Sequence, residues 1–191
     1  MELVFASNNK NKIKEIQLIM PSNVTILSLK DIGCEQEIIE NASTIEGNAM
    51  VKANYITKHY GYNCFADDSG LEVNALNGKP GVHSARYAGL QKNDDDNINK
   101  LLFNLELETN RKANFKTVIA LNYNAIQTLF TGIIEGEITK EKMGTNGFGY
   151  DPIFKPNNYD ITFGEFELLE KAKISHRGIA VKQLINYLNT L

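Results

Sequence analysis

Hydrophobic and polar positions in the first part of the chain follow the pattern of alternating strands and helices. Residues 3–6 form a short apolar run, which predicts a buried strand, and a polar turn follows at residues 7–9. Apolar residues then recur at helical spacing as far as Pro21, which predicts a helix that ends there. This order predicts the opening of an α/β unit, with residues 24–27 as its second strand.

The middle of the chain predicts a long helix followed by two short strands. A Ser-x-x-Glu capping box at residues 43–46 predicts a helix that runs to about Tyr60. Residues 64–67 and 71–75 are apolar runs that predict two strands. Between them, the segment Asp-Asp-Ser-Gly at residues 67–70 has the composition of a tight turn.

The second half of the chain predicts a helix, a hairpin and a final helix. Three acids at residues 94–96 suit the N-terminal turn of a helix, where the helix dipole favours negative charge. Residues 113–123 and 127–138 predict an antiparallel hairpin, and residues 176–191 predict the last helix. The whole pattern predicts a mixed sheet with helices on its faces.

Bulk composition narrows the class of protein. The 191 residues, 42% hydrophobic and 23% charged, suit one large domain or two small lobes that share a core. A net charge of -3 argues against a general binder of nucleic acid or of membrane surfaces. Cys34 and Cys64 lack the spacing of a zinc site or a disulfide framework. Without a signal-peptide pattern or a membrane-spanning apolar run, we expect a soluble, cytoplasmic protein.

Asp67 and Asp68 are the leading candidates for chemistry. Adjacent carboxylates after a buried strand suit a metal that faces a substrate, because Mg²⁺ takes one or two carboxylates together with phosphate oxygens. Taken alone, the same residues are better explained as a simple turn, and only the other candidate segments of the chain shift the balance toward chemistry. Glu40, which precedes the predicted long helix, is a second candidate ligand, although an exposed loop acid is the simpler explanation for it.

Two segments predict anion sites at helix N-termini. Residues 7–12 would present free amides and a lysine at the positive end of a helix dipole, although ordinary helix capping explains them as often. Lys171, His176 and Arg177 lie near the start of the last helix, where cations oppose the dipole and so indicate a bound anion. We expect neither Lys171 nor Asp68 to lie in the core.

The segment Gly-Phe-Gly-Tyr-Asp-Pro at residues 147–152 predicts a contact with a flat ligand. Its glycines let the backbone approach the ligand closely, and Phe148 can stack on it. A bulged strand weakened by glycine explains the same segment equally well.

Together these segments resemble the inosine triphosphate pyrophosphatase family, and the resemblance covers essentially the whole chain. The residues that carry it are Ser7-x-Asn9-x-x-Lys12, Glu40, Phe65-Ala66-Asp67-Asp68-Ser69-Gly70-Leu71, Pro80-Gly81-Val82-His83-Ser84-Ala85-Arg86-Tyr87, Gly147-Phe148-Gly149-Tyr150-Asp151-Pro152 and Ser175-His176-Arg177-Gly178. The resemblance implies one two-lobed α/β domain over residues 1–191, with an elongated mixed sheet, a cleft between the lobes and usually a homodimer. It also implies hydrolysis of ITP, dITP and XTP to the monophosphate and pyrophosphate, which keeps aberrant purines out of DNA and RNA.

The resemblance further implies a role for each matched residue. Asp68 would be the general base, Glu40 and Asp68 would hold Mg²⁺, and Arg177, His176 or nearby amides would donate to the 6-keto group of the base. The substrate-binding residues would be Ser7, Asn8, Asn9, Lys10, Asn11, Lys12, Ser69, Phe148, Gly149, Tyr150, Asp151, Lys171, His176 and Arg177.

Two other functions stay open on the sequence alone. A related pyrophosphatase could prefer modified pyrimidines, and the segment at residues 175–178 argues against it. A nucleotide-binding regulator without catalysis is the other alternative, and it would have no need of a second carboxylate beside the metal ligand. Comparing ITP with modified UTP and TTP tests the first, and pyrophosphate release from ITP tests the second.

Overall fold

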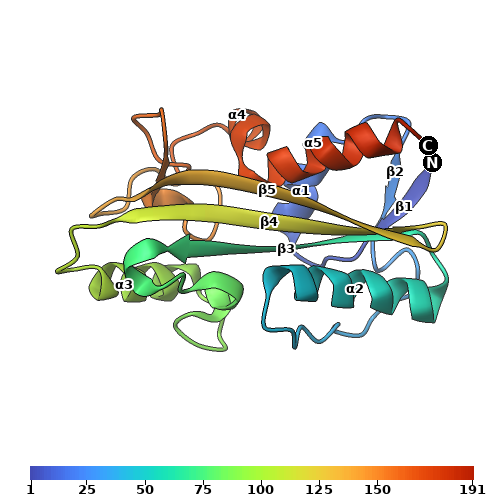
Figure 1. Cartoon of the computed structure of the whole chain (residues 1–191), viewed down its shortest axis with the longest axis horizontal. Coiled ribbons are helices and arrows are strands. Elements are labelled where there is room, and N and C mark those ends of the chain that lie inside the picture. Colours follow the sequence, from blue (N-terminus) through green and yellow to red (C-terminus); the bar gives the residue numbers. More distant parts are fainter.

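The computed structural model describes residues 1–191 and shows a six-stranded mixed sheet with helices on both faces (Figure 1). Its strands are β1 (Glu2–Phe5), β2 (Thr25–Leu27), β3 (Cys64–Val73), β4 (Lys112–Tyr123), β5 (Ile126–Ile138) and β6 (Phe154–Pro156). Its helices are α1 (Lys10–Ile19), α2 (Ile45–Tyr60), α3 (Asp94–Asn104), α4 (Leu168–Ile174) and α5 (His176–Leu188), with short 3₁₀ segments η1 (Asn74–Leu76), η2 (Gly81–Arg86) and η3 (Asp151–Ile153). The strand order is β2-β1-β3-β4-β5-β6, with β1 parallel to β2 and β3 and the other pairs antiparallel. The predicted mixed α/β fold is therefore confirmed.

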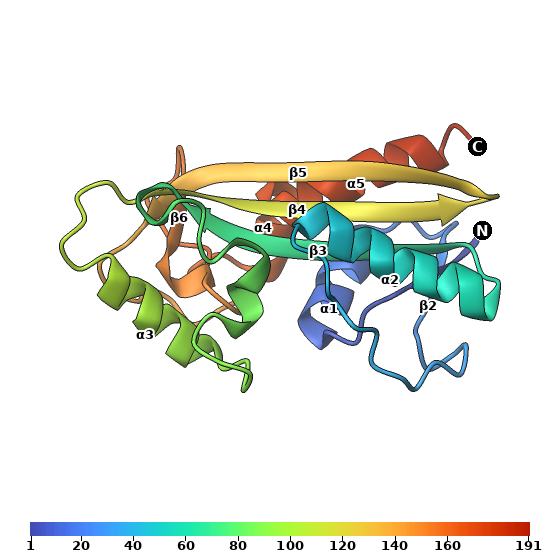
Figure 2. The ribbon, with the colours of Figure 1, turned by 60° about the horizontal axis from the view of Figure 1, so that its bottom comes forward.

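Helices cover opposite faces of the sheet at one end of the molecule, and α3 packs at the other end (Figure 2). On one face, Ile16 of α1 and Leu184 of α5 share a core with Phe65 of β3. On the other face, Ala49 of α2 shares a core with Ala66 of β3. The long strands β3, β4 and β5 run through both ends and join them into a two-lobed molecule (Figure 2).

The predicted turn at residues 67–70 does not exist, because β3 runs unbroken from Cys64 to Val73. Every residue of this strand pairs with β4, so the neighbouring strand overrides the local preference of Asp, Ser and Gly for a turn. Successive side chains of a strand point to opposite faces. Asp67 therefore points toward α1 and α5, and Asp68 points toward α2.

The other edge of β3 is covered by a strand over only part of its length. The short strand β1 pairs with β3 at Cys64 and Phe65 and then ends. The chain leaves β1 at this point and turns into α1, while β3 continues into the second lobe (Figure 2). The two aspartates lie just beyond the end of β1, beside the space between the lobes.

Several element boundaries differ from the predicted ones. The N-cap of α2 is Thr44 instead of Ser43, and its hydroxyl accepts from the backbone N–H of Gly47. The hairpin turn lies at Asn124 and Ala125, both with positive φ, and β5 begins at Ile126, one residue earlier than predicted. Helix α4 was not predicted at all, and the last helix ends at Leu188. None of the helices combines the length and the apolar character that a membrane crossing requires.

The start of α5 lies directly on β5 because position 132 is a glycine. A Cβ at Gly132 would overlap the backbone carbonyl of His176 and approach the amide of Ala180. Any other residue would push this helix away from the sheet. Gly132 therefore helps to set the position of His176 and Arg177, which begin the helix.

Candidate active site

A cavity of about 620 Å³ lies between the two lobes, beside the exposed part of β3. It brings together most of the predicted site residues: Ser7, Asn8, Asn9, Lys12, Glu40, Asp68, Ser69, Phe148, Gly149, Tyr150, Asp151, Lys171, His176 and Arg177. Lys10 and Asn11 are exposed on the first turn of α1 and do not line the cavity. Segments more than 160 residues apart in the chain thus meet in one cleft.

The turn before α1 is held by helix capping. The side-chain carbonyl of Asn9 accepts from the backbone N–H groups of Asn11 and Lys12, at 3.0 and 3.2 Å. The hydroxyl of Ser7 accepts from the backbone N–H of Asn9 at 3.3 Å. Capping therefore fixes the shape of this turn, and the exposed amide side chain of Asn8 remains on the cleft wall.

Asp67 is fully buried and enclosed by cations. Its carboxylate accepts from the ammonium of Lys12 at 3.1 Å and from Nε of Arg177 at 3.0 Å. Burial alone would raise the pKa of Asp67, but the charges of Lys12 and Arg177 outweigh it and hold the pKa well below its ordinary value. Asp67 is therefore a fixed negative charge in the wall of the cleft.

Asp68 lies on the opposite face of β3 and lines the cleft, but it is only 8% exposed, so it is more buried than expected. Its carboxylate accepts from the side-chain amide of Asn48 at 3.3 Å, and the ammonium of Lys52 lies 4.0 Å away. Burial raises the pKa of Asp68, and the neighbouring carboxylate of Glu40 adds to this effect against the opposing charge of Lys52. A cleft-facing carboxylate with a raised pKa has the properties of a general base.

Lys52 of α2 was not predicted as a site residue, yet it links the two acids that were. Its ammonium lies 2.5 Å from Glu40 and 4.0 Å from Asp68. Burial alone would raise the pKa of Glu40, but the adjacent charge of Lys52 holds it below its ordinary value. A sequence signal existed, because Asn48 and Lys52 lie four residues apart and therefore on one face of the helix.

The carboxylates of Glu40 and Asp68 fit a magnesium ion that also binds phosphate. The ammonium of Lys52 lies 2.5 Å from Glu40 and 4.0 Å from Asp68, so a positive charge is favourable near both carboxylates. Both are hard oxygen donors at the wall of the cleft. Mg²⁺ commonly uses one or two carboxylates and takes its other ligands from phosphates and water.

The cations at the start of α5 meet carboxylates of the chain itself. The ammonium of Lys171 donates to Glu15 at 2.7 Å and to Asp151 at 2.5 Å, and its side chain is only 2% exposed. The guanidinium of Arg177 donates to Glu15, to Asp67 and to the hydroxyl of Ser69. The expectation that Lys171 lies outside the core is therefore wrong. The sequence did not single out Glu15, because a lone acid in a charged helix gives no local sign of burial.

The segment at residues 147–152 is a turn and not a bulged strand. Gly147 and Gly149 have φ of 77° and 61°, which favour glycine. The backbone N–H groups of Phe148 and Gly149 donate to Asp151 and to Asp94, each at 2.8 Å. These bonds place the ring of Phe148 4.9 Å from the ammonium of Lys171, a cation–π contact at the cleft wall.

His176 is buried and neutral at the inner end of the cleft. Its ring stacks on Phe115, with centroids 4.6 Å apart. Burial lowers the pKa of His176 well below its ordinary value, and the charges of Arg177 and Lys171 lower it further. Its Nδ1 is buried without a hydrogen-bond partner in the protein, and the residue forms part of the lining of the cleft.

Comparison with known proteins agrees with this arrangement. The family model described as the Ham1 family matches residues 3–187. A protein from Flavobacterium johnsoniae named dITP/XTP pyrophosphatase is 65% identical over 98% of this chain and 98% of its own length. A protein of the same name from Porphyromonas gingivalis is 49% identical over 98% of this chain and 97% of its own. The solved structure of the Staphylococcus aureus Ham1 protein superposes with a TM-score of 0.91 at 41% identity and covers 100% of this chain and 99% of its own.

The two neighbouring aspartates should respond in opposite ways to the same substitution. Asp67→Asn leaves Lys12 and Arg177 without their buried partner and should lower the free energy of unfolding by about 3–5 kcal/mol. Asp68→Asn removes a charge that burial disfavours and should leave this free energy unchanged or raise it. Urea denaturation at pH 7 measures both, and an equal loss in the two variants would contradict the assignment.

The effect of Asp67→Asn should also depend on pH. The folded-state pKa of Asp67 is lowered, so its contribution to stability is present above the pKa of the unfolded chain, at about 4. This contribution is lost as the pH falls toward the folded-state value. The difference between the wild type and Asp67→Asn should therefore shrink below about pH 4.

Proposed function

We propose that this chain, which belongs to the Ham1 family, hydrolyses deaminated purine nucleoside triphosphates (ITP, dITP and XTP) to the monophosphate and pyrophosphate. The observation that carries the proposal is the carboxylate of Asp68, which lines the cleft and lies 4.0 Å from its nearest cation, whereas the neighbouring Asp67 is held in close ion pairs. Relatives that match along the whole chain are named for the same activity. Such an enzyme removes these purines from the nucleotide pool before they enter DNA or RNA.

Asp68 supplies the base for attack by water on the α-phosphorus. Its raised pKa makes the carboxylate a better proton acceptor than an ordinary aspartate. The side-chain amide of Asn48 and the backbone N–H of Ser69 each donate to it and fix its orientation. A water molecule in the cleft beside Asp68 would therefore be oriented and deprotonated by one group of defined geometry.

Cations near Asp68 stabilise the charge that develops on the leaving pyrophosphate. Lys12 and Lys52 line the same part of the cleft, and Glu40 and Asp68 would hold Mg²⁺. When bound, this ion neutralises phosphate charge and polarises the bond that breaks. The positive charge of this ion matters for phosphate binding, because Lys12 and Lys52 are already paired with carboxylates of the protein.

The purine base of the substrate would lie against Phe148, at the end of the cleft that His176 and Arg177 form. The three guanidinium nitrogens of Arg177 already donate to Asp67, Glu15 and Ser69, so this side chain chiefly shapes the wall. Neutral His176 lines this end of the cleft, and the ring N–H of a neutral imidazole can donate to a 6-keto group. A site built to bond this group would leave the 6-amino group of adenine unpaired and so discriminate against ATP.

Three further properties belong to the same proposal. Mg²⁺ is the cofactor, the active protein is a homodimer, and the enzyme works in the cytoplasm on the free nucleotide pool. The two carboxylates at Glu40 and Asp68 support the first of these. The other two rest on the resemblance of the sequence to the pyrophosphatase family.

Pyrophosphate release from a panel of nucleotides tests the proposed substrate class. With Mg²⁺ present, we expect release from ITP and XTP far above release from GTP and ATP, and chelation of the metal should abolish it. The panel should also contain modified UTP and TTP, because faster turnover of those would contradict the purine assignment. No release from any nucleotide by the folded protein would favour a binding protein without catalysis.

Asp68→Asn should lower the turnover of ITP by at least about 100-fold, since general-base catalysis contributes this much or more. Because Asp68 would also hold Mg²⁺, affinity for ITP is measured at saturating Mg²⁺, where it should change far less than turnover. Glu37→Gln is a matched control, because Glu37 lies at the rim of the same cleft and pairs only with Lys92. Turnover of Asp68→Asn at the wild-type rate would show that the base lies elsewhere.

A further inference from the structure

Thr117 is a fully buried polar residue of β4 that has no role in the site described so far. It lies directly opposite Ser69 of β3 in the antiparallel register, and β4 itself lies between β3 and β5. Ser69 lines the cleft, whereas Thr117 does not and is 0% exposed. The two hydroxyl oxygens lie 2.7 Å apart, an ordinary distance for an O–H···O bond. A residue behind the wall of the cleft is thus bonded to one that faces the ligand.

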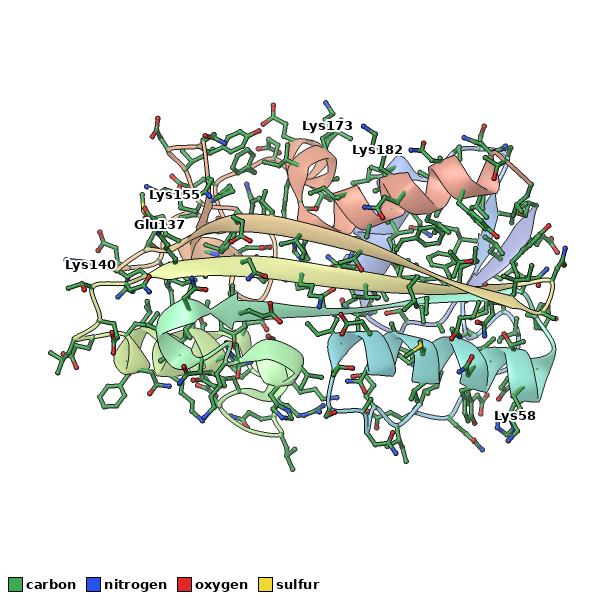
Figure 3. The ribbon with its side chains drawn as sticks, in the orientation of Figure 1. Lys58, Glu137, Lys140, Lys155, Lys173 and Lys182 are labelled. Carbon is green, nitrogen blue, oxygen red and sulfur yellow. The ribbon has the colours of Figure 1, made fainter.

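The direction of this hydrogen bond follows from the burial of Thr117. A hydroxyl has one proton to donate and two lone pairs that accept. Side chains at the periphery, such as those of Lys58, Lys173 and Lys182, point outward into water, which satisfies their polar atoms (Figure 3). Thr117 has no surface in contact with water, and the hydroxyl of Ser69 is its only side-chain hydrogen-bond partner. The Thr117 hydroxyl therefore donates to Ser69, because its proton would otherwise be buried without an acceptor.

This bond fills the remaining acceptor position of Ser69. Nη2 of Arg177 donates to the Ser69 hydroxyl at 3.1 Å, and Thr117 is the second donor. Two donors occupy both lone pairs, so the Ser69 hydroxyl can form a further bond only by donating. Its one other acceptor in the protein is Asp67 Oδ2 at 3.5 Å, which is long for O–H···O and already accepts from Nε of Arg177. The Ser69 proton is therefore available to a closer acceptor in the cleft.

We infer that Thr117 is a positioning residue, whose bond to Ser69 makes the Ser69 hydroxyl a donor to the phosphate that water attacks. Ser69 follows Asp68 directly in β3, both line the cleft, and the Ser69 backbone N–H donates to Asp68 at 2.9 Å. A phosphate beside the Asp68 carboxylate is therefore close to Ser69 as well. A donor whose orientation is fixed in advance stabilises the negative charge that develops on a phosphate oxygen. This inference rests on the proposed function, because it takes the α-phosphate of the substrate as the acceptor.

Thr117→Val removes the hydroxyl and keeps the shape of the side chain. The lone pair of Ser69 that it frees no longer forces the Ser69 proton toward the ligand, so kcat/KM for ITP should fall by roughly 3- to 10-fold, the effect of one neutral hydrogen bond. Thr117→Ser keeps the hydroxyl and should retain most of the wild-type value.

Thr57→Val is the matched control for these variants. The hydroxyl of Thr57 also bonds within the protein, to the carbonyl of Tyr62 at 3.2 Å, but it lies near the C-terminal end of α2 and does not line the cleft. Its loss should leave kcat/KM for ITP nearly unchanged. Wild-type kcat/KM in Thr117→Val, or an equal loss in Thr57→Val, would overturn the inference.

A double-mutant cycle separates positioning of Ser69 from a general effect on the fold. In a Ser69→Ala background the donor to the phosphate is already absent, so Thr117→Val should lower kcat/KM for ITP little further. If the two substitutions reduce kcat/KM independently, so that their effects multiply, Thr117 does not act through Ser69 and the inference fails.

Neutron diffraction from crystals of the deuterated protein tests the direction of the bond without a substrate. We expect the deuterium between the two hydroxyl oxygens to belong to Thr117 and that of Ser69 to point away from Thr117. A deuterium of Ser69 between the two oxygens would overturn this inference, even in a protein that hydrolyses ITP. If the protein hydrolyses no nucleotide but the deuterium belongs to Thr117, the proposed function fails and the orientation of Ser69 stands.

Discussion

The side chains of Asp67 and Asp68 leave β3 on opposite faces because this strand pairs with β4 along its whole length. One face carries α1 and α5, and the other carries α2. Asp67 therefore meets the buried cations Lys12 and Arg177. Asp68 meets the side-chain amide of Asn48 and the more distant ammonium of Lys52. Two chemically identical neighbours thereby acquire opposite shifts in pKa.

The buried ion pairs around Asp67 connect parts of the chain that are far apart in sequence. Glu15 on α1 joins Lys171 on α4 to Arg177 on α5, and Arg177 reaches β3 through Asp67. Buried pairs of this kind add little net stability over apolar residues of similar size, because the charges must be desolvated. In this protein they hold the wall of the cleft in one geometry.

Local pattern in the sequence predicted most of the elements and most residues of the cleft. The alternation of strand and helix, the long hairpin and the family resemblance depend on neighbouring residues or on contiguous motifs. The uninterrupted β3 did not follow from local pattern, because its partner β4 begins about 40 residues after it ends and overrides its turn-forming residues. The burial of Lys171 and the part played by Glu15 depend on a contact across 156 residues. Asn48 and Lys52 share a face of α2 by their spacing in the sequence, but only the packing of α2 shows that this face meets Asp68.

The central claim is that Asp68 directs a water molecule onto the α-phosphorus of a nucleoside triphosphate. Hydrolysis of ITP in water enriched with ¹⁸O, with mass spectrometry of both products, tests this claim most directly. We predict that the label appears in IMP and that the pyrophosphate carries none. Label in pyrophosphate, or release of labelled orthophosphate, would show that water attacks a different phosphorus and would contradict the account.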